Sequence, residues 1–370
     1  MSLTFIEING RNLQHNLRQF KNIGPQSELW PVIKSNAYGH GLKEVLPLLD
    51  LSSEVSGVAC VNLDEALQIA DLTTKKIMVL SYFDFDENKL TSALDKKIIL
   101  PIYSQESMQY LSDLTQRLSK SIEVMVKIDS GTNRLGFKME DDDLVSAIMS
   151  EKYFKVVSLY THLAESESED LDFTYQQLDH LAYYQKKYPL VKFHTACSAA
   201  AIGVPAARQD IVRLGLSLYG LWPSLATKQR GQAQNMDLRP VLSLKTKVIQ
   251  IKKIKVGESV GYNRTFVAKE DCQIAILPLG YYEGLPRSLS NKGSVLIKGE
   301  PCPIVGNVCM NLTMVKLPAK PDIKVGDEVV VIGQSNNSYI SAEDQAIAAQ
   351  TISYEIVTRL NASLPRVVIS

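Results

Sequence analysis

The sequence lacks any apolar run long enough to cross a membrane. Its longest apolar runs, such as IAIL at 274–277 and VVVIG at 329–333, have the length of β-strands and fall far short of a bilayer span. The amino terminus, MSLTFIEINGRN, has no basic segment followed by an apolar stretch and therefore predicts no signal peptide. We expect a cytoplasmic protein with no membrane partner.

The chain also lacks a net charge and a cysteine framework. Its 40 basic residues balance its 40 acidic ones, which gives no electrostatic reason to expect nucleic acid as a partner. The five cysteines are scattered and odd in number, a pattern that favours free thiols in a reducing compartment. Cys302 and Cys309 are close in sequence, but without a CxxC motif or a nearby histidine they predict buried structural residues and no metal site.

What the sequence does contain is material for a large core. A hydrophobic fraction of 45% with only 22% charged residues argues against global disorder, and 370 residues suffice for two domains. Short β-type runs alternate with helical patterns up to about residue 235, after which β-type segments with glycine turns dominate. We predict a first domain at 9–234 and a second, mostly β domain formed by 1–8 and 235–370.

Eight β-type runs in the first domain are separated by helical patterns. This alternation predicts parallel βα units, and eight such units close into a barrel. The predicted fold class is therefore α/β, a (β/α)8 TIM-like barrel followed by a mostly β C-terminal domain. The predicted strands lie at 31–34, 57–61, 77–80, 98–102, 122–128, 156–161, 192–195 and 211–213.

Apolar spacing and capping residues predict the helices. Leu13, Leu17 and Phe20 share one helical face, and Ser104 and Asn62 are predicted N-caps of two later helices. Longer helical patterns lie at 170–188 and, in the second domain, near 342–360.

Polar residues gather at or just after the predicted strand ends. They are Lys34, Arg134, His162, Ser198 and Arg213. Sites in (β/α)8 barrels lie at the carboxyl ends of the strands, so we expect these side chains to form one site.

Lys34 is the most unusual of these residues. It follows an apolar strand, and lysine is rarely buried without a partner. A lysine at a barrel strand end can form an imine with an aldehyde cofactor, provided that its pKa falls below the usual value of about 10.4. On position alone, a strand-end lysine that reaches water is the simpler alternative.

The segment PVIKSNAYGHG at 31–41 resembles the cofactor signature of bacterial alanine racemases. The match over 36–41 is complete, whereas Ser35 and, further on, Cys197 stand where the family usually has alanine and asparagine. Further segments resemble the family's motifs in the family's order: VMVKIDSGTNRLGF, LYTHLA, FHTACSAAA, VRLGLSLYG, SVGYNRTF, LPLGYYEGLPR, GNVCMN and TISYEI.

The resemblance implies a pyridoxal-phosphate-dependent isomerase that interconverts L-alanine and D-alanine and so supplies D-alanine for peptidoglycan. Racemisation needs proton exchange on both faces of one carbon, which two bases achieve most directly. In the family's pattern Lys34 carries pyridoxal 5'-phosphate as a Schiff base and serves one face. Tyr262 serves the other face from the second subunit of a homodimer.

Arg213 bears on the type of reaction. The resemblance places it at the pyridine nitrogen of the cofactor, with His162 bonded to it. An arginine cannot accept that proton and disfavours a positive ring nitrogen, which favours reprotonation over side reactions. By the same resemblance, Arg134 contacts the cofactor's phenolic oxygen and the substrate carboxylate. Lys127, which is carbamylated in many members, fixes Arg134.

The remaining implied site residues bind the phosphate and the substrate. A pocket bounded by tyrosine and methionine suits the small side chain of alanine. The implied phosphate donors are the hydroxyls of Tyr38, Ser198 and Tyr354 and the backbone N–H groups of Gly215 and Leu216, and the implied substrate residues are Arg134, Tyr281 and Met310.

Some departures and alternatives stay open. Asn307 and Asn311 stand where the family commonly has arginine and aspartate, near the dimer interface and the substrate access route of relatives. A serine or broad-specificity racemase would share most of the motifs. A barrel-type decarboxylase of basic amino acids is disfavoured by Arg213, and a non-catalytic cofactor carrier is disfavoured by the second domain.

Overall fold

The computed structural model describes residues 2–320 and 322–370. The chain forms two compact units. The first, which we call the barrel unit, comprises 14–34 and 46–238. The second, which we call the β unit, comprises the described residues of 1–13, 35–45 and 239–370.

The barrel unit contains eight parallel strands. β2 pairs with β9, β3 pairs with β4, and β5 to β8 form a continuous parallel sheet. Single bridges join Val32 to Ala59 and Met78 to Ile99 and so connect these pairs. The N–H of Arg213 on β9 donates to the carbonyl of Ala196, just past β8, at 3.0 Å, which closes the ring. The predicted (β/α)8 barrel is confirmed. Its strands are β2 (Glu28–Pro31), β3 (Gly57–Asn62), β4 (Lys76–Tyr82), β5 (Leu100–Ile102), β6 (Ile122–Lys127), β7 (Phe154–Tyr160), β8 (Lys192–His194) and β9 (Ile211–Leu214).

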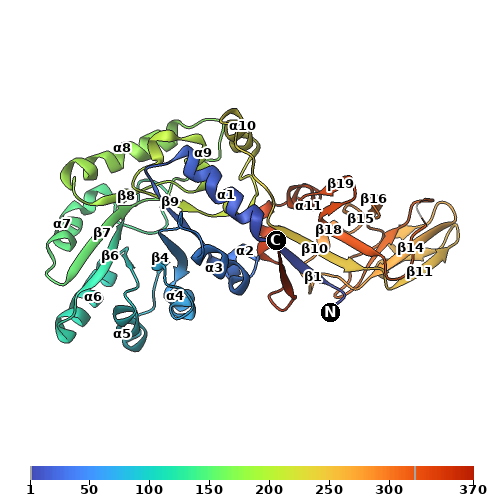
Figure 1. The fold of residues 1–370 in the computed structure, drawn as a ribbon, viewed down its shortest axis with the longest axis horizontal. Helices are drawn as coiled ribbons and strands as arrows, with labels where there is room; N and C mark the ends of the chain where they lie inside the picture. Colours follow the sequence, from blue (N-terminus) through green and yellow to red (C-terminus); the bar gives the residue numbers. More distant parts are fainter. Residues whose placement is uncertain (1, 321) are drawn as a thin grey trace. The chain divides into compact units, whose positions relative to one another are not determined.

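Helices cover the outside of these strands, as Figure 1 shows for α4 to α8. Both predicted N-caps are confirmed: the side chain of Ser104 accepts from the N–H of Ser107, and that of Asn62 from the N–H of Glu65. A cap of this kind contributes about 1 kcal/mol. The helices are α1 (Gly10–Ile23), α3 (Leu42–Asp50), α4 (Leu63–Ile69), α5 (Glu87–Asp95), α6 (Gln105–Leu118), α7 (Asp142–Ser150), α8 (Asp172–Lys187), α9 (Ser198–Gly203) and α10 (Leu225–Ala233).

The first barrel strand differs from its prediction at 31–34, because β2 ends at Pro31. The next two residues still contact both neighbouring strands: Val32 donates to the carbonyl of Leu214 at 2.7 Å, and Ile33 donates to the carbonyl of Ala59 at 2.9 Å. The chain then leaves the sheet at Lys34. Lys34 therefore follows the carboxyl end of the strand instead of belonging to it.

The segment α2 (Lys34–Tyr38) is a left-handed turn. Four consecutive residues other than glycine, Ser35 to Tyr38, have φ between 52° and 55°. This conformation costs an L-residue roughly 1–2 kcal/mol. Backbone bonds from Gly39 to the carbonyl of Ser35 (3.1 Å) and from Gly41 to that of Asn36 (3.0 Å) offset the cost, and the Asn36 side chain accepts from the N–H of Leu42. The sequence NAYGHG thus encodes an unusual turn.

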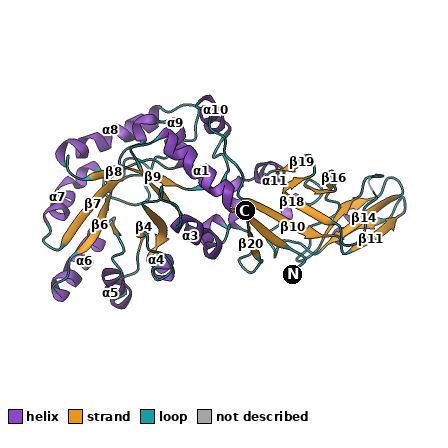
Figure 2. Ribbon diagram, in the orientation of Figure 1, coloured by secondary structure: helices purple, strands orange, loops and turns teal. Residues whose placement is uncertain are grey.

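The β unit consists mainly of strands (Figure 2). Its largest sheet has the order β16-β15-β18-β10-β1-β20, with β19 beside β18, and a second sheet has the order β11-β14-β17. The strands are β1 (Phe5–Asn9), β10 (Leu242–Lys247), β11 (Gln250–Ile254), β12 (Ser259–Val260), β13 (Phe266–Val267), β14 (Cys272–Leu277), β15 (Ser294–Ile297), β16 (Glu300–Pro303), β17 (Thr313–Lys316), β18 (Glu328–Ser335), β19 (Ser338–Ile340) and β20 (Arg366–Ile369).

The prediction of one continuous late helix near 342–360 is wrong. Two short helices occupy this region, α11 (Ala342–Ala349) and α12 (Ser353–Thr358). Gln350 has a φ of 58° and ends α11 in the left-handed conformation, which stops the helical hydrogen-bond ladder.

The close packing around the left-handed turn yields a testable prediction. A Cβ on Gly39 would lie 1.9 Å from the carbonyl oxygen of Val357, whereas a Cβ on Gly257 would meet nothing within 4 Å. Both glycines have positive φ, so Gly257→Ala controls for backbone strain alone. Gly39→Ala should destabilise the protein by more than about 3 kcal/mol, and Gly257→Ala by about 1 kcal/mol. Denaturant unfolding measures both, and equal losses would contradict the close packing at Gly39.

Candidate active site

The structure brings several predicted site residues together at the carboxyl ends of the barrel strands. Lys34 follows β2, Lys127 ends β6, His162 follows β7 and Arg213 lies on β9. The pKa of His162 falls well below its usual value, because burial and the nearby charges of Arg213, Lys127, Arg134 and Lys34 disfavour the imidazolium. These five side chains therefore form one electropositive cluster.

Lys34 has the lowered pKa that an imine-forming lysine needs. Burial lowers its pKa, the positive charge of Arg134 lowers it further, and Glu65 opposes the shift. A lower pKa increases the fraction of neutral amine near neutral pH. The amine is then available as a nucleophile or a base.

Arg213 is buried, with 4% of its surface exposed, and its hydrogen bonds go to neutral acceptors. Nη1 donates to Nδ1 of His194 at 2.6 Å and to the carbonyl of His194 at 2.8 Å. Nη2 donates to the carbonyls of Thr161 at 2.8 Å and Thr195 at 2.9 Å. Four of the five N–H donors of the guanidinium are thus used. Across residues 2–320 and 322–370, no acceptor bonds the fifth donor, Nε–H, and no carboxylate pairs with the charge.

The histidine bonded to Arg213 is His194, which corrects the expectation that His162 bonds to it. Since Nδ1 of His194 accepts from Arg213, its Nε2 carries the hydrogen and donates to Oγ of Ser158 at 3.0 Å. The ring also stacks on Tyr160, with centroids 4.8 Å apart. Burial and the charge of Arg213 hold the pKa of His194 well below its usual value.

Sequence reasoning missed His194, although a signal was present. His194 lies in a predicted strand, as the last residue but one, and it belongs to the quoted segment FHTACSAAA. His162 instead lies just past β7, where its carbonyl accepts from Oγ1 of Thr132 at 3.2 Å. Which histidine meets Arg213 depends on how far each strand reaches.

The loop after β6 positions Arg134. The Asp129 carboxylate accepts from the N–H groups of Gly131 and Asn133 at 3.0 Å each, and Phe137 donates to the carbonyl of Lys127 at 2.9 Å. Gly136 has a φ of 116°, and a Cβ there would lie 2.8 Å from the Lys127 carbonyl oxygen. The tight loop keeps the base of the exposed Arg134 side chain in place.

Lys127 is buried, and no acidic side chain of the described residues is in direct contact with it. Its exposed fraction is 5%, and Nζ lies 4.5 Å from the centre of the Tyr160 ring. Burial and the charges of Arg213 and Arg134 lower its pKa well below the usual value, while Asp129 opposes the shift. Burial and the two arginine charges therefore favour the neutral amine of Lys127 over its ammonium form.

Ser198, Gly215 and Leu216 lie together where β8 and β9 lead into helical turns. Oγ of Ser198 accepts from the N–H of Gly215 at 3.0 Å. Ser198 is the first residue of α9, and Leu216 is the first residue of the 3-10 helix η3 (Leu216–Tyr219). N–H groups in a first helical turn have no acceptor within the helix, so they can bind an anion.

The other predicted site residues lie in the β unit, in two groups. Tyr38 and Tyr354 face each other, with ring centroids 6.4 Å apart and an interplanar angle of 46°. Tyr281 and Met310 lie on neighbouring loops, because Tyr281 donates to the carbonyl of Cys309 at 3.0 Å. Tyr262 is the most exposed of the five, at 73%.

The two unusual asparagines support these loops. Nδ2 of Asn307 donates to the carbonyl of Tyr262 at 3.0 Å. Nδ2 of Asn311 donates to Oε1 of Glu283 at 2.8 Å, and Oε2 of Glu283 accepts from Gly280 at 2.7 Å. The asparagines hold the loops that carry Tyr262 and Tyr281.

Within the described part of the chain, no group of three or more histidine, cysteine, aspartate or glutamate residues is placed to hold a metal ion. The same residues include no helix that is long and apolar enough to span a membrane.

Known proteins provide an independent comparison. Residues 8–223 match the family model for the N-terminal domain of alanine racemase, and residues 241–368 match the model for its C-terminal domain. The alanine racemase of Carboxydothermus hydrogenoformans is 34% identical over 99% of this chain and 100% of its own length. That of Clostridium perfringens is 33% identical over 96% of this chain and 92% of its own.

Solved structures agree with the sequence matches. Alanine racemase of Clostridium difficile superimposes with a TM-score of 0.91 at 31% identity, covering 100% of this chain and 96% of the other. The Bacillus anthracis enzyme, solved with bound L-Ala-P, gives a TM-score of 0.90 at 28% identity, again covering 100% and 96%. The two family models together span nearly the whole chain, and the chain belongs to the alanine racemase family.

Proposed function

We propose that this protein racemises alanine with pyridoxal 5'-phosphate bound at the carboxyl ends of the barrel strands. The observation that carries the proposal is the buried Arg213, whose Nε–H donor has no bonded acceptor among the described residues, in the same cluster as a lysine of lowered pKa. Membership of the alanine racemase family supports the same activity.

The donor set fits this cofactor in three places. The amine of Lys34 suits its aldehyde, and Nε–H of Arg213 suits its pyridine nitrogen, which is a neutral acceptor. Ser198 and the backbone at Gly215 and Leu216 suit its phosphate. The positive charge of the whole cluster suits an anionic group. We infer that Tyr38 and Tyr354 add hydroxyl donors to the phosphate.

The bound cofactor withdraws electrons from the α-carbon of the substrate and makes its α-proton acidic. Arg213 reduces this electron withdrawal. Its guanidinium cannot accept a proton from the pyridine nitrogen, and it disfavours a second positive charge on that nitrogen. His194, neutral and bonded to both Arg213 and Ser158, fixes the orientation of the guanidinium. This arrangement favours return of the proton to carbon over decarboxylation.

Two residues of the protein exchange the proton. The Lys34 amine, kept neutral by its lowered pKa, takes or returns the proton on the D-alanine side. The Tyr262 hydroxyl serves the opposite face from a second copy of the chain, so the working unit is a homodimer. The high exposure of Tyr262, Tyr281 and Met310 within one chain supports such a shared site.

The substrate and its setting follow from the same residues. Arg134 holds the substrate carboxylate, which a guanidinium binds through two parallel hydrogen bonds. Tyr281 and Met310 line the access route, and Tyr354 limits the room for the side chain, which favours alanine over larger amino acids. We infer a cytoplasmic enzyme that supplies D-alanine for peptidoglycan. The five free cysteines support this location.

Lys127 completes the site as a carbamate. Its buried neutral amine adds carbon dioxide and releases one proton, which gives an anion beside Arg134 and Arg213. That anion holds Arg134 in place and balances part of the positive cluster.

The first test is racemisation itself. The purified protein, supplied with cofactor, should convert each enantiomer of alanine into the other and should turn over L-serine far more slowly. Lys34→Ala should abolish activity, the visible absorbance of the bound cofactor and its fixation by borohydride. Lys186→Ala, an exposed lysine on α8, is the matched control and should change none of the three. A clear preference for serine, or fixation that survives Lys34→Ala, would refute the assignment.

The second test separates the two faces of the substrate. Tyr262→Phe removes one hydroxyl, so exchange of the α-proton with deuterated water should fall by roughly 10²–10⁴-fold from one enantiomer of alanine only. Cofactor absorbance should stay unchanged. Tyr282→Phe, another exposed tyrosine of the β unit, is the control. Equal losses for both enantiomers would show that Tyr262 is not the base of one face.

The third test concerns Lys127. Loss of a charged hydrogen bond to Arg134 costs about 1.5–3 kcal/mol, so Lys127→Ala should raise KM for alanine by roughly 10–100-fold. Wild-type protein in ¹³C-bicarbonate should show a carbamate carbon signal that Lys127→Ala lacks. Removing dissolved carbon dioxide should lower wild-type activity, and bicarbonate should restore it. A wild-type spectrum without that signal would disprove carbamylation.

A further inference from the structure

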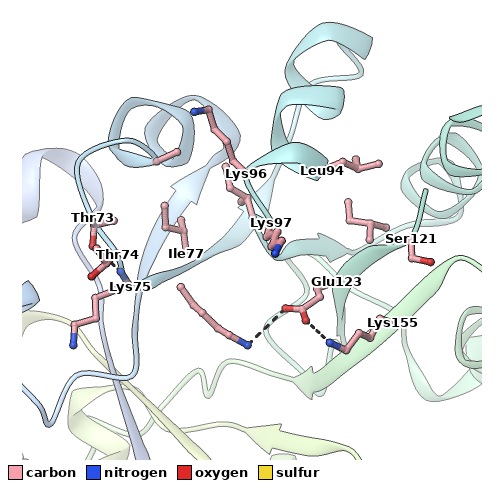
Figure 3. Close-up of a pocket in the computed structure, with 14 residues that line it drawn as sticks. Thr73, Thr74, Lys75, Ile77, Leu94, Lys96, Lys97, Ser121, Glu123 and Lys155 are labelled. Atoms are coloured by element: carbon pink, nitrogen blue, oxygen red, sulfur yellow. Dashed lines mark hydrogen bonds and ion pairs between the residues drawn. The ribbon is translucent and has the colours of Figure 1, made fainter. Parts of the chain in front are cut away.

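A second concave site lies at the opposite, amino-terminal ends of the barrel strands. It is a cavity of about 630 Å³, lined by the segments that lead into β4, β5, β6 and β7 (Figure 3). Lys34, Lys127 and Arg213 instead lie at or near the carboxyl ends of their strands, so this cavity shares no residue with the proposed active site.

The lining of this cavity is strongly basic. Five lysines face one acidic residue, Glu123. The lysines are Lys75, Lys76, Lys96, Lys97 and Lys155.

A cavity in the β unit shows that such an imbalance is not general. Its size is similar, about 640 Å³, but three lysines there face Glu270 and Asp271. Both acids are paired: Lys316 lies 2.7 Å from Glu270, and Lys255 lies 2.6 Å from Asp271. The excess of positive charge is therefore four in the barrel cavity and one in the β-unit cavity.

Two of the five barrel-cavity lysines already have partners outside it. Nζ of Lys75 donates to the carbonyls of Ser52 and Val55 at 2.9 Å each. Lys96 pairs with Asp71. In Figure 3 both side chains extend away from the middle of the view. They add to the positive potential but are committed to other contacts.

Among the residues that line the cavity, one carboxylate lies with the remaining three lysines, and it pairs with two of them. Oε1 of Glu123 lies 2.5 Å from Nζ of Lys155, and Oε2 lies 3.9 Å from Nζ of Lys76. Figure 3 shows Lys97 and Lys155 on either side of Glu123. One negative charge among three ammonium groups leaves an excess of two.

Lys97 is placed here despite a backbone cost. It has a φ of 55° in the turn that closes α5, where its N–H donates to Leu94 at 3.1 Å and that of Ile98 donates to Ala93 at 3.0 Å. Glycine is the residue this turn favours. Among the described residues, no acceptor bonds the Lys97 ammonium and no acid pairs with it. The turn fixes the base of the side chain beside the cavity.

We propose that this cavity binds a phosphate monoester through Lys76, Lys97 and Lys155. A monoester carries nearly two negative charges at neutral pH and three acceptor oxygens, which matches the excess charge and the three ammonium groups. The buried side chains of Ile77, Leu94 and Ile98 form an apolar part of the lining that suits the organic portion of the ester. The volume is sufficient for a small molecule.

The binding should be modest and sensitive to salt. The side chains of Lys76 and Lys155 are 65% and 70% exposed, so water and ions screen their charges. The three lysines repel one another when the cavity holds no anion, and neutralising two of them should not destabilise the fold.

The experiment titrates the holoenzyme with phenyl phosphate, followed by calorimetry at low and moderate salt. We expect saturable binding that weakens with salt and that is weaker for phenyl sulfate, which carries one charge. The double variant Lys97→Gln/Lys155→Gln should bind at least about tenfold more weakly, with unchanged racemisation and an unchanged or higher unfolding midpoint. Glutamine is shorter than lysine, shares its unbranched Cβ and Cγ and carries no charge, so both substitutions remove the charge without adding length.

A matched control and two opposing outcomes complete the test. Lys253→Gln/Lys255→Gln changes two lysines of the β-unit cavity and should leave phenyl phosphate binding as in the wild type. Absence of saturable binding to the wild type would overturn the proposal. Binding to the Lys97→Gln/Lys155→Gln variant with wild-type affinity would overturn it as well, because the ligand would then occupy another site.

Discussion

The site depends on one buried charge, that of Arg213, with which no acid among residues 2–320 and 322–370 is paired. Arg213 lies inside the barrel and its charge is held by a neutral imidazole and by three backbone carbonyls. Burying a guanidinium this way is costly unless every donor is used. The carbonyls belong to residues just after β7 and in or after β8, so the register of these strands sets the position of the charge. The ends of the barrel strands thus supply the carbonyl acceptors that offset the cost of burying this charge.

Burial and nearby positive charge together lower the pKa values of the groups around Arg213. Lys127, His162 and His194 all have pKa values well below their usual ranges, and burial is the first cause and Arg213 the second in each case. Lys34 follows the same pattern, with Arg134 as the neighbouring charge. These shifts favour the neutral forms of the amines and imidazoles, and a neutral amine can attack an aldehyde or accept a proton. Burial and neighbouring arginine charges thus act on all four groups in the same direction.

The sequence predicted the barrel because alternating β and helical patterns are local features, as the caps at Asn62 and Ser104 illustrate. It placed the first strand too late, because four left-handed residues in succession have no propensity signal apart from the glycines that follow them. The family resemblance paired Arg213 with His162, whereas His194 at the end of β8 is the partner, and the relative reach of β7 and β8 decides which histidine meets Arg213. Contacts between the ends of different strands leave no local pattern in the sequence, so they could not be predicted from it.

The positive charges at the two ends of the barrel strands differ in their exposure to solvent. At the carboxyl ends the charge of Arg213 is buried, so it shifts the pKa values of its neighbours strongly, and a small displacement changes their reactivity. At the amino ends the lysines are largely exposed, so their mutual repulsion is screened and costs little stability. An anion at the carboxyl ends is therefore held by specific hydrogen bonds, whereas one at the amino ends is held by net charge. The same parallel sheet can carry both sites, since neither uses the other's residues and the strands between them are buried.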